Sequence, residues 1–465
     1  MSVPAVVIAA PASGSGKTTV ATGLVGALRA AGHRVAPFKV GPDYIDPGYH
    51  GLAAGRPGRN LDTVLVGAER VPGLYAHGSV GCDIAVVEGV MGLFDGKIAA
   101  SDTDATPSAE GSTAQVAALL GAPVILVVDA RGHSQSLAAL LHGFATYDPA
   151  VRIGGVILNR VGSDRHAEVL RAACARVGLP VLGVLGRMDE LSVPSRHLGL
   201  IPAVEHGVAA VSAVDAMTSL VAANVDLDAV VAAARSATAA PPWDPATEVG
   251  EFAATDGRVC VALAGGPAFT FGYAEHRELL DAAGADVAVF DPLIDPLPEK
   301  AAALVLPGGF PEEHAAELSA NTGLRAAVAE RVAAGMPVHA ECAGLLYLTR
   351  TLDGHDMTGV LDVAAEFGRT LTLGYREAVA LTDSSLWTAG ERVTGHEFHR
   401  TQLVSGAATE TSAWGWRSWA GAPVREGFVH GTVHASYLHT HPAGNPQAIG
   451  RFVRAAERFA KSYGR

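Results

Sequence analysis

The sequence predicts an α/β protein of two domains, in which a doubly wound parallel sheet is followed by a second, separate α/β fold. Three observations lead to this prediction. Short runs of Val, Ile and Ala alternate with helical patterns in both halves, a proline-rich stretch separates the halves, and 465 residues exceed the usual length of one domain. Apolar residues form 49% of the chain and charged residues 17%, a balance that excludes global disorder.

The first domain is expected over residues 1–235. Its strands are predicted by apolar runs at residues 5–10, 34–40, 83–87, 124–128 and 154–158. The spacing of Val20, Leu24 and Leu28 predicts a helix after the first of these strands. Because the runs are apolar almost throughout, both faces of the sheet should be covered.

A linker is expected over residues 236–257, where Pro241, Pro242 and Pro245 remove backbone donors and should exclude helix. The second domain should occupy residues 258–465. Its strands are predicted at residues 259–264, 287–290, 303–306 and 337–340, with a helix at 324–334.

Net charge, apolar runs and cysteine content indicate which binding partners and which cellular compartment to expect. The 47 acidic and 34 basic side chains give a net charge of −13, the wrong sign for coating nucleic acid or an anionic membrane. The longest apolar run, residues 116–128, is shorter than the roughly twenty residues of a membrane-spanning helix. The first basic residue, Lys17, follows the N-terminal apolar run, so no secretory signal is expected. The 4 cysteines are dispersed and form no C-x-x-C pair, which favours a reducing, cytoplasmic location.

A phosphate-binding loop is predicted at residues 11–19, Pro-Ala-Ser-Gly-Ser-Gly-Lys-Thr-Thr, between a strand and a helix. Backbone N–H groups and the helix N-terminus would face the phosphates, Lys17 would reach the outer ones and Thr18 would bind Mg²⁺. Pro11 replaces the usual first glycine, and a plain Gly/Ser turn is the alternative. The candidate ATP-binding residues are Ser13, Gly14, Ser15, Gly16, Lys17, Thr18 and Thr19, with Asn159 as a further candidate at the end of another strand.

Acidic residues follow other strands at what should be the same edge of the sheet. They are Asp43, Asp46, Glu88 and Asp95. Hard carboxylate oxygens suit Mg²⁺, and we predict Thr18, Asp46 and Glu88 as its ligands. Each acid alone could equally be a solvated loop residue. An anionic substrate would also need a basic group, for which Arg56 is the candidate, with Arg59 and Arg196 as further options.

Residues 338–345, Val-His-Ala-Glu-Cys-Ala-Gly-Leu, have the pattern of a nucleophile elbow, in which a strand ends at a nucleophile and a helix follows. The helix N-terminus should favour the thiolate of Cys342, whereas the other cysteines are interpreted as structural. Gly308 and Gly309 follow a predicted strand and could supply oxyanion-hole donors, with an ordinary tight turn as the alternative.

A general base for Cys342 is expected in the histidine-rich residues 431–442. The clustered histidines also suggest a metal site, and residues 396–399, His-Glu-Phe-His, superficially resemble a zinc-protease motif. That motif requires histidines four positions apart on a helix, and these are three apart. A zinc protease is therefore excluded.

Taken in order, these motifs resemble the cobyrinic acid/hydrogenobyrinic acid a,c-diamide synthase family over essentially the whole chain. The most specific stretches are residues 38–47, 55–62, 88–96, 341–344 and 436–441. The resemblance implies a P-loop synthetase domain similar to dethiobiotin synthetase, joined to a class I, triad-type glutamine amidotransferase domain. It also implies ATP- and glutamine-dependent amidation of the c and then the a carboxylate of a corrinoid ring, with Mg²⁺ required.

Site roles follow from the same resemblance. Cys342 matches the nucleophile and His439 its base. Asp43, Asp46, Glu88 and Asp95 match family residues tied to phosphate and metal handling or substrate activation. The predicted substrate and acyl-phosphate residues are Asp43, Tyr44, Asp46, Asp95 and Arg56. The sequence departs from the generic amidotransferase pattern at Ala340, in place of a glycine, and at His441, in place of the triad glutamate, so the third triad member is unassigned.

Other function classes remain as alternatives. Cobyric acid synthase and CTP synthase also join a P-loop synthetase to a glutaminase, and a partition-type ATPase switch shares the variant loop. The expected partners are a corrinoid polycarboxylate and L-glutamine, without nucleic acid or membrane, and a homodimer is the oligomer considered. The Ala/Gly/Arg-rich composition suggests a GC-rich genome. Such genomes often carry the aerobic pathway, which favours hydrogenobyrinic over cobyrinic acid as substrate.

Overall fold

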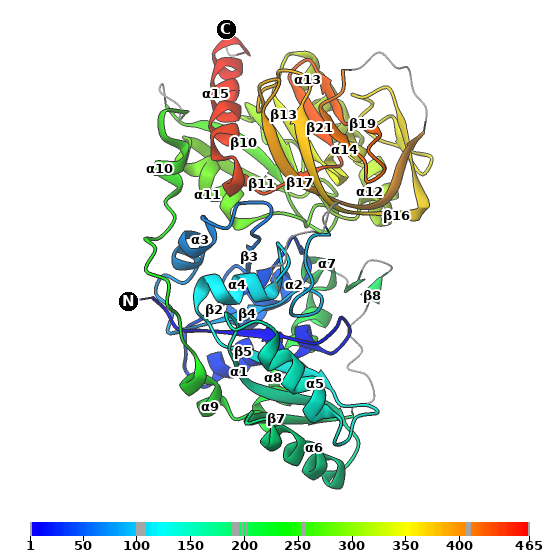
Figure 1. Ribbon diagram of the computed structural model, residues 1–465. Coiled ribbons are helices and arrows are strands. Elements are labelled where there is room, and N and C mark those ends of the chain that lie inside the picture. The colour runs from blue at the N-terminus through cyan, green and yellow to red at the C-terminus, as the bar shows by residue number, and fades with distance from the viewer. Residues whose placement is uncertain are drawn as a thin grey trace. The chain divides into compact units, whose positions relative to one another are not determined.

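The computed structural model describes residues 2–98, 108–187, 202–252, 257–404 and 411–463, and the backbone alone of 195–196 and 199–200. It divides into two compact units, Met1–Trp243 and Asp244–Arg465 (Figure 1). This division falls inside the segment that the sequence predicts as the linker.

Within the described part of unit 1, seven strands form one parallel sheet in the order β3-β2-β4-β1-β5-β6-β7. The strands are β1 (Ala5–Ala9), β2 (Val35–Val40), β3 (Arg59–Leu61), β4 (Ile84–Glu88), β5 (Val124–Asp129), β6 (Ile153–Val161) and β7 (Val181–Gly186). Residues of β1, β2 and β4 are buried throughout, as the continuous apolar runs require. Parallel pairing places the carboxyl ends of β1, β2 and β4 at one edge, where the phosphate loop begins.

Helices connect these strands. They are α1 (Lys17–Ala30), α2 (Asp46–Ala54), α3 (Val71–Gly78), α4 (Thr113–Leu120), α5 (Leu137–Tyr147), α6 (Asp164–Arg176), α7 (Ala203–His206), α8 (Val208–Asn224) and α9 (Leu227–Ala233). Helix α1 packs against α2, α8 and α9, and Gly23 and Gly26 allow the close approach to α8, since a Cβ at either would collide with Met217 or Thr218. A two-stranded ribbon joins β8 (Ser195–Arg196) to β9 (Gly199–Leu200).

The segment predicted as a linker is divided between the two units. Residues 236–243 lie on unit 1, where Ala237 N–H donates to Leu120 and Trp243 N–H donates to Gly73. The next residues form α10 (Pro245–Val249) and a 3₁₀ turn, Gly250–Phe252. Asp244 caps this helix and Pro245 occupies its first position, where a missing N–H costs nothing. The prediction that the prolines exclude helix was therefore wrong at this point.

Unit 2 contains, among its described residues, a six-stranded sheet in the order β11-β10-β12-β13-β21-β20. The strands are β10 (Val259–Ala264), β11 (Ala285–Phe290), β12 (Ala303–Leu306), β13 (Val338–Glu341), β20 (Phe428–His430) and β21 (Val433–Ser436). All pairs are parallel except β20 with β21. The helices are α11 (Ala274–Ala282), α12 (Ala315–Ala320), α13 (Thr322–Ala333), α14 (Ala343–Leu348) and α15 (Pro446–Tyr463). The strands and helix predicted for this domain are thus present, with bounds that differ by a few residues.

A second, largely antiparallel sheet in unit 2 has no counterpart among the sequence predictions. Its centre is a long hairpin of β16 (Ala364–Ala380) and β17 (Arg392–Val404), prominent in Figure 1. The remaining strands are β14 (Thr351–Leu352), β15 (His355–Asp356), β18 (Trp414–Arg417), β19 (Pro423–Glu426) and β22 (His439–Thr440). Strand β22 pairs with β17, so this sheet positions His439.

Candidate active site

The phosphate loop of unit 1 connects β1 to α1. Gly14 and Gly16 both adopt positive φ, 76° and 95°, which glycine alone reaches without strain. Asn159 donates from its side chain to the Ser15 carbonyl at 2.9 Å, and Arg160 donates to the Gly14 carbonyl at 2.8 Å. The end of β6 therefore holds the loop in shape. Asn159, predicted to contact ATP, is a support of the loop in this structure.

A buried lysine joins the acidic residues beside this loop. The Lys39 ammonium lies 2.6 Å from Asp46 Oδ2, 3.0 Å from Glu88 Oε1 and 3.8 Å from Asp43 Oδ2. Thr18 donates its hydroxyl to Glu88 Oε1 at 2.6 Å and lies 3.3 Å from Asp46 Oδ2. The structure thus brings together Thr18, Asp46 and Glu88, the predicted metal ligands, with Asp43 at the edge of the group.

The charges in this cluster are strongly coupled. Burial alone would lower the pKa of Lys39, but the Asp46 and Glu88 carboxylates outweigh it and raise that pKa. Burial acts to raise the pKa of Glu88, yet Lys39 and a His50 contact of 2.7 Å hold it well below its usual range. Glu88 is therefore ionised and Lys39 charged at neutral pH.

The donor set fits Mg²⁺. Within the described ranges, no three His, Cys, Asp or Glu side chains are arranged to hold a metal ion. Mg²⁺ often takes only one or two carboxylates and completes its shell with waters and nucleotide phosphates. Thr18, Asp46 and Glu88 supply such a partial set of hard oxygens, and the Lys39 ammonium already contacts two of the same oxygens.

Lys17 and Asp95 both contact the segment that follows β4. The Lys17 ammonium donates to the Met91 carbonyl at 2.5 Å, and burial with the nearby Lys39 lowers the pKa of Lys17. Asp95 accepts from Gly92 N–H at 2.9 Å, in the segment that follows β4. Leu93 N–H in turn donates to Ala10, which packs this segment against the start of the loop.

Other residues predicted for substrate handling are placed less centrally. Tyr44 lies in a turn in which Asp43 Oδ1 accepts from the N–H groups of Ile45 and Asp46. The Arg56 guanidinium instead contacts the Gly78 and Val80 carbonyls and the Cys82 sulfur. These contacts give no support to Arg56 as a substrate group. The side chain of Arg196 is outside the described residues.

In unit 2, Cys342 stands at the junction of β13 and α14 with a strained backbone, φ 48° and ψ −95°. Its N–H donates to Ser436 at 2.7 Å, and Gly344 N–H donates to Pro307. Gly344 permits this packing, since a Cβ there would collide with Leu306. The nucleophile elbow predicted from the sequence therefore has the expected strand-turn-helix geometry.

The thiol of Cys342 is buried at the N-terminus of α14. Burial, followed by the nearby Glu312 carboxylate, raises the pKa of Cys342 well above its usual range, although Ala343 N–H acts in the opposite direction. Burial therefore opposes the stabilisation of the thiolate that is expected from the helix N-terminus. A base must remove the proton before the sulfur can act as a nucleophile.

His439 lies on β22 and is fully buried. It pairs in register with His396 of β17, and Gly308 lies against its ring, because a Cβ at 308 would collide with Cε1. Gly309 is equally confined by the Ala268 carbonyl. Of the two predicted oxyanion-hole glycines, Gly308 thus lies against the predicted base.

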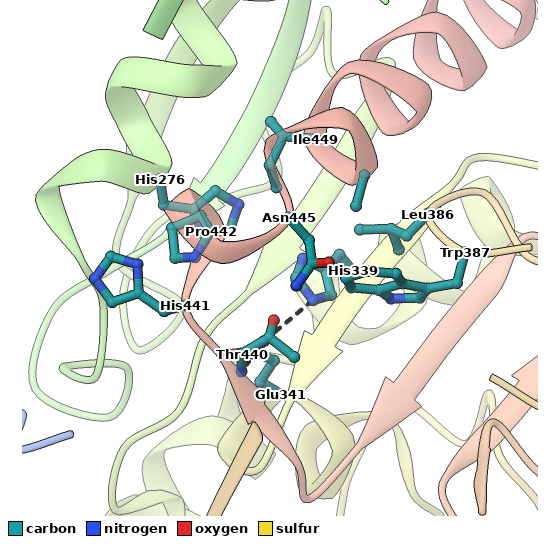
Figure 2. A pocket seen from close by; sticks show the side chains of 11 residues that line it. His276, His339, Glu341, Leu386, Trp387, Thr440, His441, Pro442, Asn445 and Ile449 are labelled. Carbon is teal, nitrogen blue, oxygen red and sulfur yellow. Dashed lines mark hydrogen bonds and ion pairs between the residues drawn. The ribbon is translucent and has the colours of Figure 1, made fainter. Parts of the chain in front are cut away.

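A carboxylate that sequence reasoning did not select also lies here. Glu341, directly before the nucleophile, has Oε2 at 3.7 Å from Nδ1 of His439. Figure 2 shows Glu341 in a pocket with His339, Thr440 and His441. His441 accepts from Ala443 N–H through Nδ1 and lies against Tyr273, with ring centroids 4.0 Å apart.

Comparison with known proteins identifies a known domain family in each half of the chain. Residues 6–201 match the CobQ/CobB/MinD/ParA nucleotide binding domain, and residues 260–447 match the CobB/CobQ-like glutamine amidotransferase domain. The chain is 62% identical to hydrogenobyrinate a,c-diamide synthase of Mycobacterium tuberculosis over 98% of each chain, and 57% identical to that of Streptomyces coelicolor over 97% of each. The chain belongs to the a,c-diamide synthase family. A cobyrinate a,c-diamide synthase of Gloeobacter violaceus is 42% identical, over 97% of this chain and 96% of the relative.

Membership of this a,c-diamide synthase family confirms the resemblance drawn from the motifs and the predicted fold class. It also confirms a nucleotide-binding domain followed by a glutamine amidotransferase domain. The residues that sequence reasoning did not select are Lys39, His50 and Glu341. The available signal was a lone charged side chain within an otherwise apolar strand, which applies to Lys39 and to Glu341.

Glu426 gives the family's glutaminase unit a testable pH dependence. Its carboxyl accepts from Ser436 Oγ at 2.6 Å and from Tyr437 N–H at 2.7 Å, and burial raises its pKa from 4.5 to about 7. The folded chain therefore keeps a proton that the unfolded chain loses above pH 4.5, so stability falls as the pH rises through 7. The free energy of unfolding lost through the Glu426 carboxyl is about 3 kcal/mol.

We expect Glu426→Gln to remove that part of the dependence. Thermal unfolding midpoints of both proteins at pH 5 and pH 8 test this, because the midpoint of the wild type should fall more between the two pH values. Equal falls in both proteins would contradict the assignment.

Proposed function

We propose that the protein uses ATP and glutamine to amidate the a and c carboxylates of hydrogenobyrinic acid in cobalamin biosynthesis. The observation that carries the proposal is the presence of two complementary chemistries in one chain. Unit 1 has a phosphate loop beside Glu88 and Asp46, and unit 2 has a nucleophile elbow at Cys342 and a buried histidine, His439. The most similar relatives reported above bear the name of this reaction's substrate.

The synthetase half activates a carboxylate. A carboxylate is a poor acyl donor, so ATP would convert it to an acyl phosphate, from which inorganic phosphate leaves readily. Lys17 and the loop N–H groups would hold the phosphates. Mg²⁺, held by Thr18, Asp46 and Glu88 together with phosphate oxygens, would offset their negative charge.

The glutaminase half supplies ammonia. His439 would take the Cys342 proton, and the sulfur would attack the amide carbon of glutamine, which leads to a thioester and free ammonia. Gly308 and Gly309 would stabilise the oxyanion formed on that carbon. The ammonia must reach the acyl phosphate unprotonated, which favours transfer without release into bulk water.

Alternative functions account for less of the chain. A partition-type ATPase switch does not account for the nucleophile elbow at Cys342. A CTP synthase would be expected to have a glutamate at the position of His441. In the described helices none is long and apolar enough to cross a membrane. Cytoplasmic location, absence of nucleic acid and a homodimer remain predictions.

A direct assay tests the substrate. We expect ATP, Mg²⁺ and glutamine to convert hydrogenobyrinic acid to its diamide, with a kcat/KM at least tenfold above that for cobyrinic acid, resolved by chromatography. Equal use of both corrinoids would contradict the proposed selectivity. If CTP formed from UTP while neither corrinoid reacted, the proposed function would be wrong.

A further inference from the structure

The carboxylate of Glu341 has one anchored oxygen and one directed at His439. Oε1 accepts from the backbone N–H and the hydroxyl of Thr440, at 3.1 and 2.9 Å, and lies 3.3 Å from Nε2 of His339. Oε2 lies 3.7 Å from Nδ1 of His439. The anchoring contacts thus fix the carboxylate while leaving its second oxygen toward the base.

We propose that Glu341 is the positioning carboxylate of the glutaminase, holding Nδ1 of His439 so that Nε2 takes the proton of Cys342. This inference rests on the proposed glutaminase chemistry. In hydrolases with a nucleophile and a histidine base, a carboxylate at Nδ1 fixes the tautomer and orientation of the ring and stabilises the imidazolium. The present separation exceeds a hydrogen bond, and such contacts commonly tighten when substrate binds.

The local strand pairing places Glu341 beside His439. Glu341 pairs in register with Ser436 across β13 and β21, which brings the end of β13 beside the chain that leads to β22. His439 and Thr440 are consecutive, so the strand that carries the base also anchors the carboxylate. The position of Glu341 relative to His439 is therefore set by a few adjoining residues.

The charge state of Glu341 suits the role. Burial by itself would raise its pKa, but the adjacent His339 and His439 rings hold the pKa well below its usual range. An ionised carboxylate at this position can accept from Nδ1–H and can stabilise a positive charge that develops on the ring.

Other acidic or substituted positions are engaged elsewhere. His441, at the position of the usual triad glutamate, uses Nδ1 to accept from Ala443. Both oxygens of Glu426 accept hydrogen bonds, from Ser436 and Tyr437, and Glu397 pairs with Arg376 at 2.6 Å. Of these three glutamates, Glu341 is the one with an oxygen beside His439.

The test compares Glu341→Gln with the wild type in two separate assays, glutamate release from glutamine and corrinoid amidation with ammonium chloride. We expect kcat for glutamate release to fall about 10²–10³-fold, with the KM for glutamine changed less than about threefold. Ammonia-dependent amidation should be unchanged. Glu341→Asp should release glutamate with a kcat at least tenfold higher than that of Glu341→Gln. Asp286→Asn, at an exposed carboxylate paired with Arg258, is the control and should match the wild type.

A second variant keeps the inference testable if Glu341→Gln fails to fold. Thr440→Val removes one donor to Oε1 while keeping the backbone donor, and should lower kcat for glutamate release several-fold without raising KM. An unchanged kcat in either variant, or an aspartate variant no better than glutamine, would overturn the role of Glu341. Failure of the wild type to amidate either corrinoid would instead contradict the proposed substrate, because glutamate release is measured independently.

Discussion

We expect Cys342→Ala to lose glutamine-dependent amidation entirely while keeping amidation driven by added ammonia. The thioester can form only at a nucleophilic sulfur, and a methyl group offers no covalent route. The acyl phosphate, in contrast, is proposed to form in unit 1 at the groups around Lys17 and Glu88, which this substitution does not touch. The loss should therefore be complete with one nitrogen source and absent with the other.

Diamide formation with glutamine and with ammonium chloride at alkaline pH measures both routes for this variant. Cys260→Ala, at a cysteine on β10 of the same unit, is the matched control and should keep both activities. His439→Ala should behave like Cys342→Ala with a small residual rate, since a general base typically contributes about 10²–10⁴-fold. Full glutamine-dependent activity in Cys342→Ala would refute the assignment of the nucleophile.

The Lys17→Ala variant should have the opposite profile. Removing the ammonium deprives the outer phosphates of their buried counter-charge, and we expect ATP-dependent amidation to fall at least about 10³-fold with either nitrogen source. Glutamate release without corrinoid should remain close to that of the wild type, because Cys342 and His439 belong to the other unit.

Phosphate release and diamide formation, each measured with glutamine and with ammonia, separate the steps affected in Lys17→Ala. Lys300→Ala, at an exposed lysine, serves as the control and should retain both activities. Normal ATP-dependent turnover in a folded Lys17→Ala protein would show that Lys17 does not hold the phosphates.

Motifs that fold within one short segment could be read from the sequence. The phosphate loop and the elbow each consist of a strand, a turn and a helix in succession, so spacing alone predicts the geometry at Gly16 and at Cys342. Parallel strands were equally recognisable, because burial on both faces makes β1 apolar throughout and β4 apolar up to its last residue, Glu88.

Contacts that depend on strand register could not be predicted in this way. Lys39 meets Glu88 because they are register partners across β2 and β4, and Glu341 meets Thr440 across a separation of 99 residues. Register is decided by tertiary packing, which a single sequence does not specify. The long hairpin of β16 and β17 was missed because Phe367 and Leu373 face outward and blur the alternation of apolar and polar residues.

The left-handed backbone at Cys342 has a consequence for how this position evolves. A residue with a Cβ held at φ 48° and ψ −95° costs the folded state on the order of 1–3 kcal/mol, which glycine would largely avoid. Selection for catalysis and selection for stability therefore act in opposite directions at one residue. In a lineage that draws its nitrogen from ammonia alone, only the second pressure remains, and position 342 would drift toward glycine while the rest of the elbow stays folded.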